Sequence, residues 1–188
     1  MTANLRAGRK ASARSLREVP KGYELIDGKL QEKPSMGAES SWLGLRVYLL
    51  LDAYCNAQGR GVAVGADFAF RCFGLPNKVR KPDAAVLDEN PRTFIPGRPE
   101  YSGRPLLVVE VVSPNEAVEE LTARIVDFRG IQTPLIWVVE PAARHVTIYR
   151  ADGTISQVTE PGELSGEGVL PGLAVPLSAI LPRREATP

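Results

Sequence analysis

The order of hydrophobic and polar residues predicts a chain of short strands and two longer helices. Residues 39–58 carry apolar side chains at the three- and four-residue spacing typical of an amphipathic helix, and Gly59 follows as the expected C-terminal cap. The expected core-facing residues of this helix are Trp42, Leu45, Leu49 and Ala53, with Leu43, Val47 and Leu50 beside them. We expect this face to pack against a sheet.

Short apolar runs predict the strands of that sheet. Residues 23–30 form two extended runs around Asp27-Gly28, a dipeptide typical of a tight hairpin turn. A second Asp-Gly turn at 152–153 precedes another run. The expected strands after the first hairpin are 62–70, 84–87, 106–112, 135–139, 146–149 and 154–158. The unbroken apolar run at 106–109 indicates a strand covered on both faces, as at the centre of a mixed sheet.

A second helix is expected at residues 115–129, between two of these strands. Leu121, Ile125 and Phe128 would form its inner face. Ser113, followed by Pro114 and three residues later by Glu116, fits a capping box at the start of this helix, and a site role for Ser113 is the less favoured interpretation. The Pro-, Gly- and Arg-rich connection 89–105 reads as a surface loop.

Together these elements predict a single α/β (α+β) domain with a mixed central sheet flanked by helices. We place the folded domain at residues 21–182, after a basic arm at 1–20 and before a frayed tail at 183–188. A chain of 188 residues that is 44% apolar and 24% charged is typical of a globular domain, which excludes wholesale disorder, a coiled coil or collagen. No apolar run approaches the ~18 residues that a membrane span requires.

The small numbers of cysteine and histidine residues limit the kinds of metal and catalytic site that the chain can form. Cys55 and Cys72 form neither a CxxC pair nor a disulfide framework, which favours a reducing, cytoplasmic location. A single histidine, His145, excludes a His-rich zinc site and disfavours a Ser-His-Asp triad.

The net charge of +1 conceals an uneven distribution. Residues 1–21 contain six basic side chains and one acidic one, whereas the other 167 residues carry 17 basic and 21 acidic groups. Such an arm is suited to lie along a nucleic-acid backbone, since its cations release condensed counterions on binding. A solvated tail without a ligand and a transit peptide are the two other interpretations of the same composition.

Two carboxylates stand out among the candidate functional residues. Glu110 lies inside the apolar run 106–112, where it must be paired, neutral or bound to a cation. Asp83 precedes the expected strand 84–87, and adjacent strands would bring both carboxylates to one hard cation. Glu24 and Asp67 are weaker carboxylate candidates. Arg124, on the second helix, follows Glu120 by four residues, so a surface ion pair is the simple interpretation of it.

Four of these segments, in this order, resemble the Uma family of putative restriction endonucleases. They are Tyr-Glu-Leu-Ile-Asp-Gly at 23–28, Lys-Pro-Asp at 81–83, Val-Glu-Val-Val-Ser-Pro at 109–114 and Pro-Leu-Ile-Trp-Val-Val-Glu-Pro at 134–141, followed by Leu-Pro-Gly-Leu at 170–173. The resemblance covers about residues 20–181. It implies the PD-(D/E)xK nuclease-like fold, that is, a restriction-endonuclease-like mixed sheet with a divalent-metal site at one end.

The resemblance also implies roles for particular residues. Asp83 matches the motif aspartate, Glu110 the motif glutamate and Glu24 the early glutamate of the family. Asp83, Glu110 and the carbonyl of Val111 would hold Mg²⁺ or Mn²⁺. Arg124 occupies the helix position where the family has its lysine, and an arginine stays protonated and cannot act as a base.

The sequence departs from the family pattern at further positions. Val112 stands where the simpler D/E-x-K spacing has its lysine, and Glu39 and Ser40 stand where the family often has a histidine. Lys81 is an alternative cation, although strand alternation would point it to the face opposite Asp83.

The leading functional hypothesis is a metal-dependent endonuclease that hydrolyses DNA phosphodiester bonds, with Arg124 stabilising the transition state and Glu24 orienting water or a second ion. The runner-up is a nuclease-fold protein that binds nucleic acid or a partner protein without cleavage. Hydrolysis of another phosphoester is a third possibility. None of these hypotheses involves a membrane, and double-strand cleavage by two active sites would suit a homodimer.

Overall fold

A computed structural model describes residues 19–33, 36–72, 78–88, 100–114 and 116–183. The elements, in chain order, are β1 Tyr23–Ile26, β2 Lys29–Glu32, α1 Ala38–Gln58, β3 Val62–Gly65, β4 Phe70–Arg71, β5 Val79–Arg80, β6 Ala84–Leu87, β7 Pro105–Val111, α2 Val118–Gly130, β8 Leu135–Glu140, β9 His145–Arg150, β10 Ile155–Thr159, β11 Glu163–Ser165, β12 Ala174–Pro176 and α3 Leu177–Ile180. The basic arm up to residue 18, most of the expected loop 89–105 and the tail from residue 184 lie outside the described residues.

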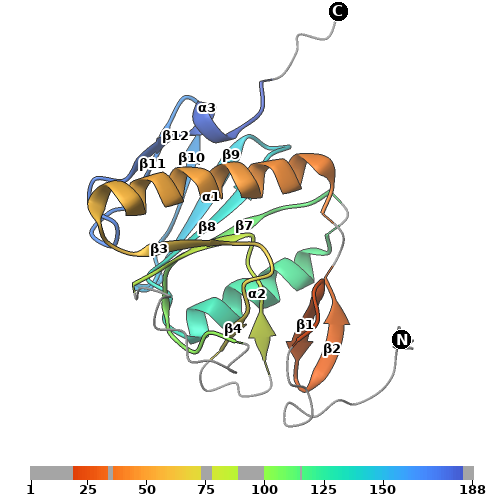
Figure 1. The fold of residues 1–188 in the computed structure, drawn as a ribbon. Coiled ribbons are helices and arrows are strands. Elements are labelled where there is room, and N and C mark those ends of the chain that lie inside the picture. Colours follow the sequence, from red (N-terminus) through yellow and green to blue (C-terminus); the bar gives the residue numbers. More distant parts are fainter. Residues whose placement is uncertain (1–18, 34–35, 73–77, 89–99, 115, 184–188) are drawn as a thin grey trace, which may run out of the picture.

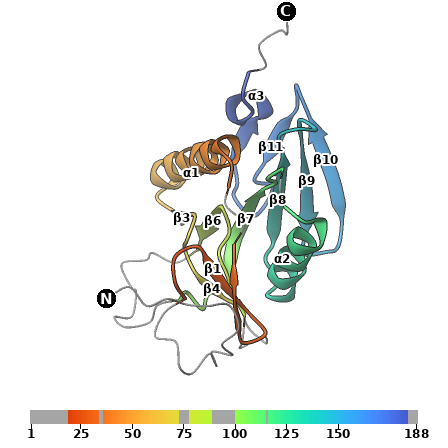
Figure 2. The ribbon, with the colours of Figure 1, turned by 90° about the vertical axis from the view of Figure 1, so that its right-hand side faces the viewer.

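A six-stranded mixed sheet in the order β10-β9-β8-β7-β6-β3 forms the centre of the fold (Figure 1). Strand β7 is parallel to β8, whereas β6 pairs with β7 in the antiparallel direction. All seven residues of β7 are buried, which confirms that the apolar run around 106–109 is a central strand covered on both faces. The α1 and α2 helices lie on opposite faces of this sheet (Figure 2), so the expected architecture is confirmed.

A smaller sheet, in the order β2-β1-β5-β4, lies beside the main one. Its β1–β2 hairpin turns at Asp27 and Gly28, whose φ angles of 50° and 75° are those expected of an Asp-Gly turn. The expected strand 62–70 is wrong as a single element. Asp67 has a φ of 69° and a turn separates β3 in the main sheet from β4 in the small one, so that one run contributes to two sheets.

The face of α1 that packs on the sheet differs from the predicted one. The buried apolar side chains are those of Leu43, Val47, Leu51 and Cys55. The predicted inner residues Trp42, Leu45 and Leu49 are 45%, 56% and 55% exposed. Both sides of the helix are apolar, so spacing alone could not select the buried side. Gly44 lies on the buried side, and an added Cβ there would be only 3.5 Å from Cβ of Asp83, which shows how closely this face approaches the strand.

The second helix begins later than predicted. Its N-cap is Ala117, without a side-chain cap, so Ser113 does not cap it. Ser113 instead starts a separate turn, in which its carbonyl accepts a hydrogen bond from the backbone N–H of Glu116 at 3.0 Å. Ile125 and Phe128 are buried against the sheet as expected, and Leu121 packs partly against the same cluster.

Among the described residues, no helix is both long and apolar enough to span a membrane.

Candidate active site

Asp83 is fixed at the junction between the two sheets. It directly precedes β6, and its backbone N–H donates to the carbonyl of Val109 in β7 at 3.1 Å. Its Oδ2 atom accepts a hydrogen bond from the backbone N–H of Val111 at 2.7 Å. The Asp83 carboxylate is therefore held beside the backbone of Glu110 and Val111, at the point where β6 begins.

Glu110 is the buried carboxylate of the central strand. Its side chain is fully buried, and Oε2 accepts a hydrogen bond from Nε of Arg124 at 3.0 Å. The other oxygen, Oε1, is buried without a hydrogen-bond partner. Burial raises the pKa of Glu110 to about 7. The positive charges of Arg124 and Lys33 lower this pKa and the negative charge of Asp83 raises it, so the two cations offset the effect of burial only in part. The expected pairing of this glutamate is thus present, but it leaves one oxygen free.

Arg124 connects the second helix to this carboxylate. Its guanidinium donates to Glu110 and to Glu116, and the residue is only 3% exposed. The expected ion pair with Glu120 is wrong, because Arg124 points toward the sheet while Glu120 accepts a hydrogen bond from Gln31 at 3.2 Å. Burial alone would lower the pKa of Arg124, but the charges of Glu110 and Glu116 outweigh it and raise that pKa. Arg124 therefore stays a cation.

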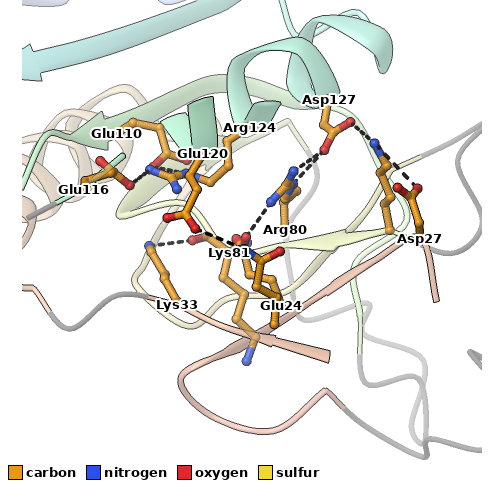
Figure 3. Close-up of polar contacts among 12 residues, drawn as sticks. Glu24, Asp27, Lys33, Arg80, Lys81, Glu110, Glu116, Glu120, Arg124 and Asp127 are labelled. Carbon is orange, nitrogen blue, oxygen red and sulfur yellow. Dashed lines mark hydrogen bonds and ion pairs between the residues drawn. The ribbon is translucent and has the colours of Figure 1, made fainter. Parts of the chain in front are cut away.

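Lys33 lies beside Asp83, although nothing in the sequence indicated it. It follows β2 directly, and its ammonium group donates to Oδ1 of Asp83 and to the carbonyl of Lys81, both at 2.8 Å. Burial lowers the pKa of Lys33, but the charges of Asp83 and Glu110 outweigh it and leave that pKa above its ordinary value. Figure 3 shows side chains from the hairpin, from β7 and from α2 meeting in this region.

Glu24 lies in a neighbouring ion network rather than beside Asp83. Its Oε2 atom is 2.7 Å from the guanidinium of Arg80, and its Oε1 atom accepts the backbone N–H of Lys81 at 2.8 Å. Arg80 also binds Asp127 of α2 through its Nε at 2.7 Å (Figure 3). Both oxygens of Glu24 thus have protein partners, and the network ties the hairpin, β5 and α2 together.

Asp67 and Lys81 lie away from the carboxylate pair. Asp67 is in the turn before β4, where its Oδ1 accepts the backbone N–H of Gly22 at 3.3 Å. The ammonium group of Lys81 donates to the carbonyls of Val19 and Pro20, at 3.3 and 2.8 Å. Lys81 therefore points away from Asp83, as strand alternation predicts.

Ser113 and Ser40 both lie at the end of β7. The hydroxyl of Ser113 is buried without a hydrogen-bond partner. Ser40, at the start of α1, donates to the carbonyl of Val112 at 3.4 Å, while Glu39 beside it is exposed. Ser40 therefore ties α1 to the end of β7.

Two hollows border the site from different sides. A groove of about 260 Å³ is lined by Met36, Ser41, Gly44, Leu45, Tyr48, Gly65, Ala66 and Asp83. A cavity of about 170 Å³ between the hairpin and α2 is lined by Glu24, Ile26, Gln31, Glu32, Lys33, Arg80, Glu119, Glu120, Ala123 and Arg124. The first is bordered mainly by apolar side chains, and the second mainly by charged ones.

The carboxylates of Asp83 and Glu110 are the oxygen ligands that this region offers to a divalent cation. In the described part of the chain, no group of three or more His, Cys, Asp or Glu side chains is arranged to hold a metal ion. Mg²⁺, however, is usually held by only one or two carboxylates and keeps several waters. The unpartnered Glu110 Oε1 and the neighbouring Asp83 suit that requirement. The residues present therefore fit a hydrated ion of this type.

Comparisons with known proteins give the family and the fold of the chain. A family model for Uma2, described as putative restriction endonuclease, matches residues 14–178. The crystal structure of a putative nuclease belonging to DUF820 from Anabaena variabilis matches with a TM-score of 0.76 and 17% sequence identity, covering 90% of this chain and 96% of that chain. No curated protein matches significantly. At this identity the structural likeness establishes a shared nuclease-like fold, while the family model spans most of the sequence. The chain therefore belongs to the Uma2 family of putative restriction endonucleases.

Proposed function

We propose that this protein is a divalent-metal-dependent endonuclease that hydrolyses DNA phosphodiester bonds. The observation that carries the proposal is the unpartnered, buried Oε1 of Glu110, in the strand whose next backbone N–H, that of Val111, binds Asp83. Lys33 binds this aspartate and Arg124 binds this glutamate. Two acids that suit a hard cation, beside two cations that suit a phosphate, are what phosphodiester hydrolysis requires. Membership of a family described as putative restriction endonucleases supports the same activity.

Asp83, Glu110 and the carbonyl of Val111 would hold the Mg²⁺ or Mn²⁺ ion. When bound, such an ion polarises a phosphoryl oxygen and lowers the pKa of a coordinated water. Because the pKa of Glu110 is raised by burial, this carboxyl group must give up its proton before it can bind a cation. Arg124 remains next to it as a compensating charge.

The two cations have different tasks in this proposal. Arg124 is always protonated, so it can stabilise negative charge on the phosphoryl group but cannot take up a proton. Lys33 has an ammonium group with three donors, of which two are directed to Asp83 and to the carbonyl of Lys81. We assign to Lys33 the part of the motif lysine, namely contact with the reacting phosphate.

Glu24 acts as a positioning residue. It binds the Arg80 side chain and the Lys81 backbone N–H, and these two residues immediately precede Pro82 and Asp83. The carboxylate of Glu24 thus fixes the chain just before Asp83, and its proposed effect on catalysis passes through the position of that aspartate.

A second candidate function is nucleic-acid or protein binding without cleavage. Three of the four carboxylate oxygens of Asp83 and Glu110 already have protein partners, in Lys33, the Val111 N–H and Arg124. An ion would have to displace or share some of these contacts. This observation favours a member of the family in which the cations have replaced the metal.

Nicking of supercoiled plasmid separates the two functions. Purified protein is incubated with plasmid in Mn²⁺ and then in Mg²⁺, alongside Asp83→Asn and the matched control Asp67→Asn, whose carboxylate lies in the turn before β4. The endonuclease proposal expects metal-dependent nicking that is lost in Asp83→Asn and kept in Asp67→Asn. Failure of both the wild-type protein and Arg124→Lys to nick in either metal, with DNA binding intact, would establish the second candidate.

A further inference from the structure

Arg124 divides one edge of its guanidinium between two carboxylates. Its Nε atom donates to Oε2 of Glu110 at 3.0 Å, and its Nη2 atom donates to Oε1 of Glu116 (Figure 3). Nε and Nη2 lie on the same side of a guanidinium and form a fork that can bind both oxygens of one carboxylate in a bidentate pair. Arg124 therefore binds Glu110 through one oxygen only, although it has the donors to bind both.

Other arginines in the described part of the chain give this edge to a single carboxylate. Nε of Arg150 donates to both oxygens of Glu167, at 2.8 and 2.9 Å, and its Nη2 lies 2.7 Å from Oε1 of the same residue. Nε and Nη2 of Arg80 both bind Oδ2 of Asp127, at 2.7 and 2.6 Å. An arginine that faces one carboxylate in this fold thus directs both nitrogens of the edge to it.

Glu116 is held in a position from which it can bind part of the edge of Arg124. Its backbone N–H donates to the carbonyl of Ser113 at 3.0 Å, which closes a turn shortly after β7. Its side chain is 6% exposed, and its Oε2 atom is buried without a hydrogen-bond partner. Because a buried carboxylate is costly unless it is paired, the contact with Arg124 offsets the cost of burying Glu116.

The division of this edge leaves Oε1 of Glu110 without a partner. That oxygen is buried, and it is the one that the proposed function gives to the divalent cation. If Glu116 did not engage Nη2 of Arg124, this nitrogen could turn to Oε1 and close a bidentate pair with Glu110. Such pairs are among the strong hydrogen-bonded contacts in proteins, so a cation would have to break one in order to bind.

We propose that Glu116 is a positioning residue of the metal site, which holds Nη2 of Arg124 away from Glu110 so that Oε1 of Glu110 can bind the cation. The inference rests on the proposed endonuclease function and adds a residue to its metal site. Partners that orient a metal ligand without touching the ion typically change metal affinity by about 10- to 100-fold when they are mutated.

The negative charge of Glu116 is a second route by which this residue can favour a cation, and two variants separate the routes. Glu116→Ala removes both the charge and the acceptor for Nη2, whereas Glu116→Gln removes the charge and keeps an oxygen acceptor. Arg124 and Glu110 remain paired with each other in both variants, so neither is left as an isolated buried charge and the fold should persist.

Mn²⁺ binding to the full-length protein without DNA tests the proposal. Free Mn²⁺ is followed by electron paramagnetic resonance during titration of wild type, Glu116→Ala, Glu116→Gln and the charge control Glu119→Ala. We expect Kd to rise about tenfold or more in Glu116→Ala, and to stay closer to wild type in Glu116→Gln. Glu119→Ala removes an exposed acid in the first turn of α2 and should bind like wild type. Equal weakening in both variants at position 116 would assign the effect to charge alone and overturn the proposal.

A second background shows whether Glu116 acts through Arg124. The ammonium group of a lysine has no planar edge and cannot form the bidentate pair. In Arg124→Lys, Glu116→Ala should therefore change Kd much less than it does in the wild-type protein, and the difference is the coupling of a double-mutant cycle. An undiminished effect in this background would contradict the proposal.

A crystal structure of Glu116→Ala checks the geometry without any metal. Nη2 of Arg124 should lie within hydrogen-bond distance of Oε1 of Glu110, so that both oxygens of this glutamate are bound. A structure in which Arg124 still leaves Oε1 unbound would overturn the proposal.

The results that count against this inference differ from those that count against the endonuclease function. Mn²⁺ affinity and nicking that are the same in wild type and Glu116→Ala would overturn the inference and uphold the function. Absence of Mn²⁺ binding to the wild-type protein would overturn both.

Discussion

The ammonium group of Lys33 lies 2.8 Å from Oδ1 of Asp83, although 50 positions of the chain separate the two residues. The contact joins the end of the first hairpin to the start of β6, and the carbonyl of Lys81 holds the same ammonium group at 2.8 Å. A lysine therefore lies beside the candidate catalytic aspartate although it belongs to none of the motif segments named in the sequence.

Replacing this lysine should impair cleavage strongly. In Lys33→Gln we expect nicking to slow by about 100-fold or more, which is the usual range for removing a positioned acid, base or charge at a reacting phosphate. The matched control is Lys29→Gln, since Lys29 is an exposed lysine of the same hairpin. Initial nicking rates of the two variants give the comparison, and equal rates would remove Lys33 from the proposed mechanism.

Arg124 should matter for stability as well as for activity. In Arg124→Met the buried carboxylates of Glu110 and Glu116 are deprived of their shared partner, and breaking such a pair costs about 3–5 kcal/mol of unfolding free energy. Arg124→Lys keeps a cation and should cost less. Arg129→Met, at an exposed position of the same helix, should stay within about 0.5 kcal/mol of wild type. Urea unfolding measures all three, and a stable Arg124→Met would show that the pair contributes little.

The basic arm should control the salt dependence of DNA binding. We expect the variant with Arg6, Arg9, Lys10, Arg14 and Arg17 all changed to Gln to show a shallower dependence of log K on log salt. On a single strand, the slope should fall by about 0.7 for each phosphate that the altered arm no longer neutralises. Asp83→Asn should keep the wild-type slope, because the arm is intact in it. Identical slopes for the arm variant and wild type would assign the arm to the solvated-tail interpretation.

The buried thiol of Cys72 gives a prediction for pH. Burial raises the pKa of Cys72 to about 12, with the charge of Asp127 acting in the same direction. Because this value lies above the ordinary 9.0, the folded protein holds the proton more tightly than the unfolded chain. The stability that this group contributes is full below pH 9 and disappears as pH rises toward 12.

Thiol labelling and unfolding together check this. At about pH 8, below the ordinary thiol pKa, Cys72 should not react with a disulfide reagent until the protein is unfolded, as followed by mass spectrometry of its peptide. Urea unfolding of wild type and Cys72→Ala should differ in their dependence on pH between about 9 and 11. Rapid labelling of native Cys72, or parallel pH curves, would contradict the assignment.

Several elements could be predicted because their signals are local. The run at 84–87 coincides with β6, and the run at 106–112 becomes β7 within one residue at each end. The Asp27-Gly28 turn needs only two positive φ angles, which these residue types supply. The buried face of α1 was not predictable in this way, because the choice between Leu43 and Leu45 depends on which side meets the sheet.

The candidate site was predictable only in part, for the same reason. Asp83 and Glu110 were found because a charged residue beside or inside an apolar strand is unusual. Lys33 gave no such signal, since a lysine after a hairpin resembles any solvated lysine. Leu25 in β1 pairs with Val79 in β5, and this pairing places the hairpin beside the segment that leads to Asp83. The contact between Lys33 and Asp83 depends on that long-range pairing. The partners of Arg124 were likewise hidden, because the orientation of α2 selects Glu110 and Glu116 over Glu120.

The distribution of the site along the chain has a consequence for protein synthesis. Lys33, Asp83, Glu110 and Arg124 come from the hairpin, the β6 junction, β7 and α2, and β7 is completed on its other side only by β8. A ribosome-bound chain that ends before α2 has the two acids but not the arginine, and it lacks the strand that supports Glu110. A partly made chain therefore cannot assemble the charges proposed to cut DNA.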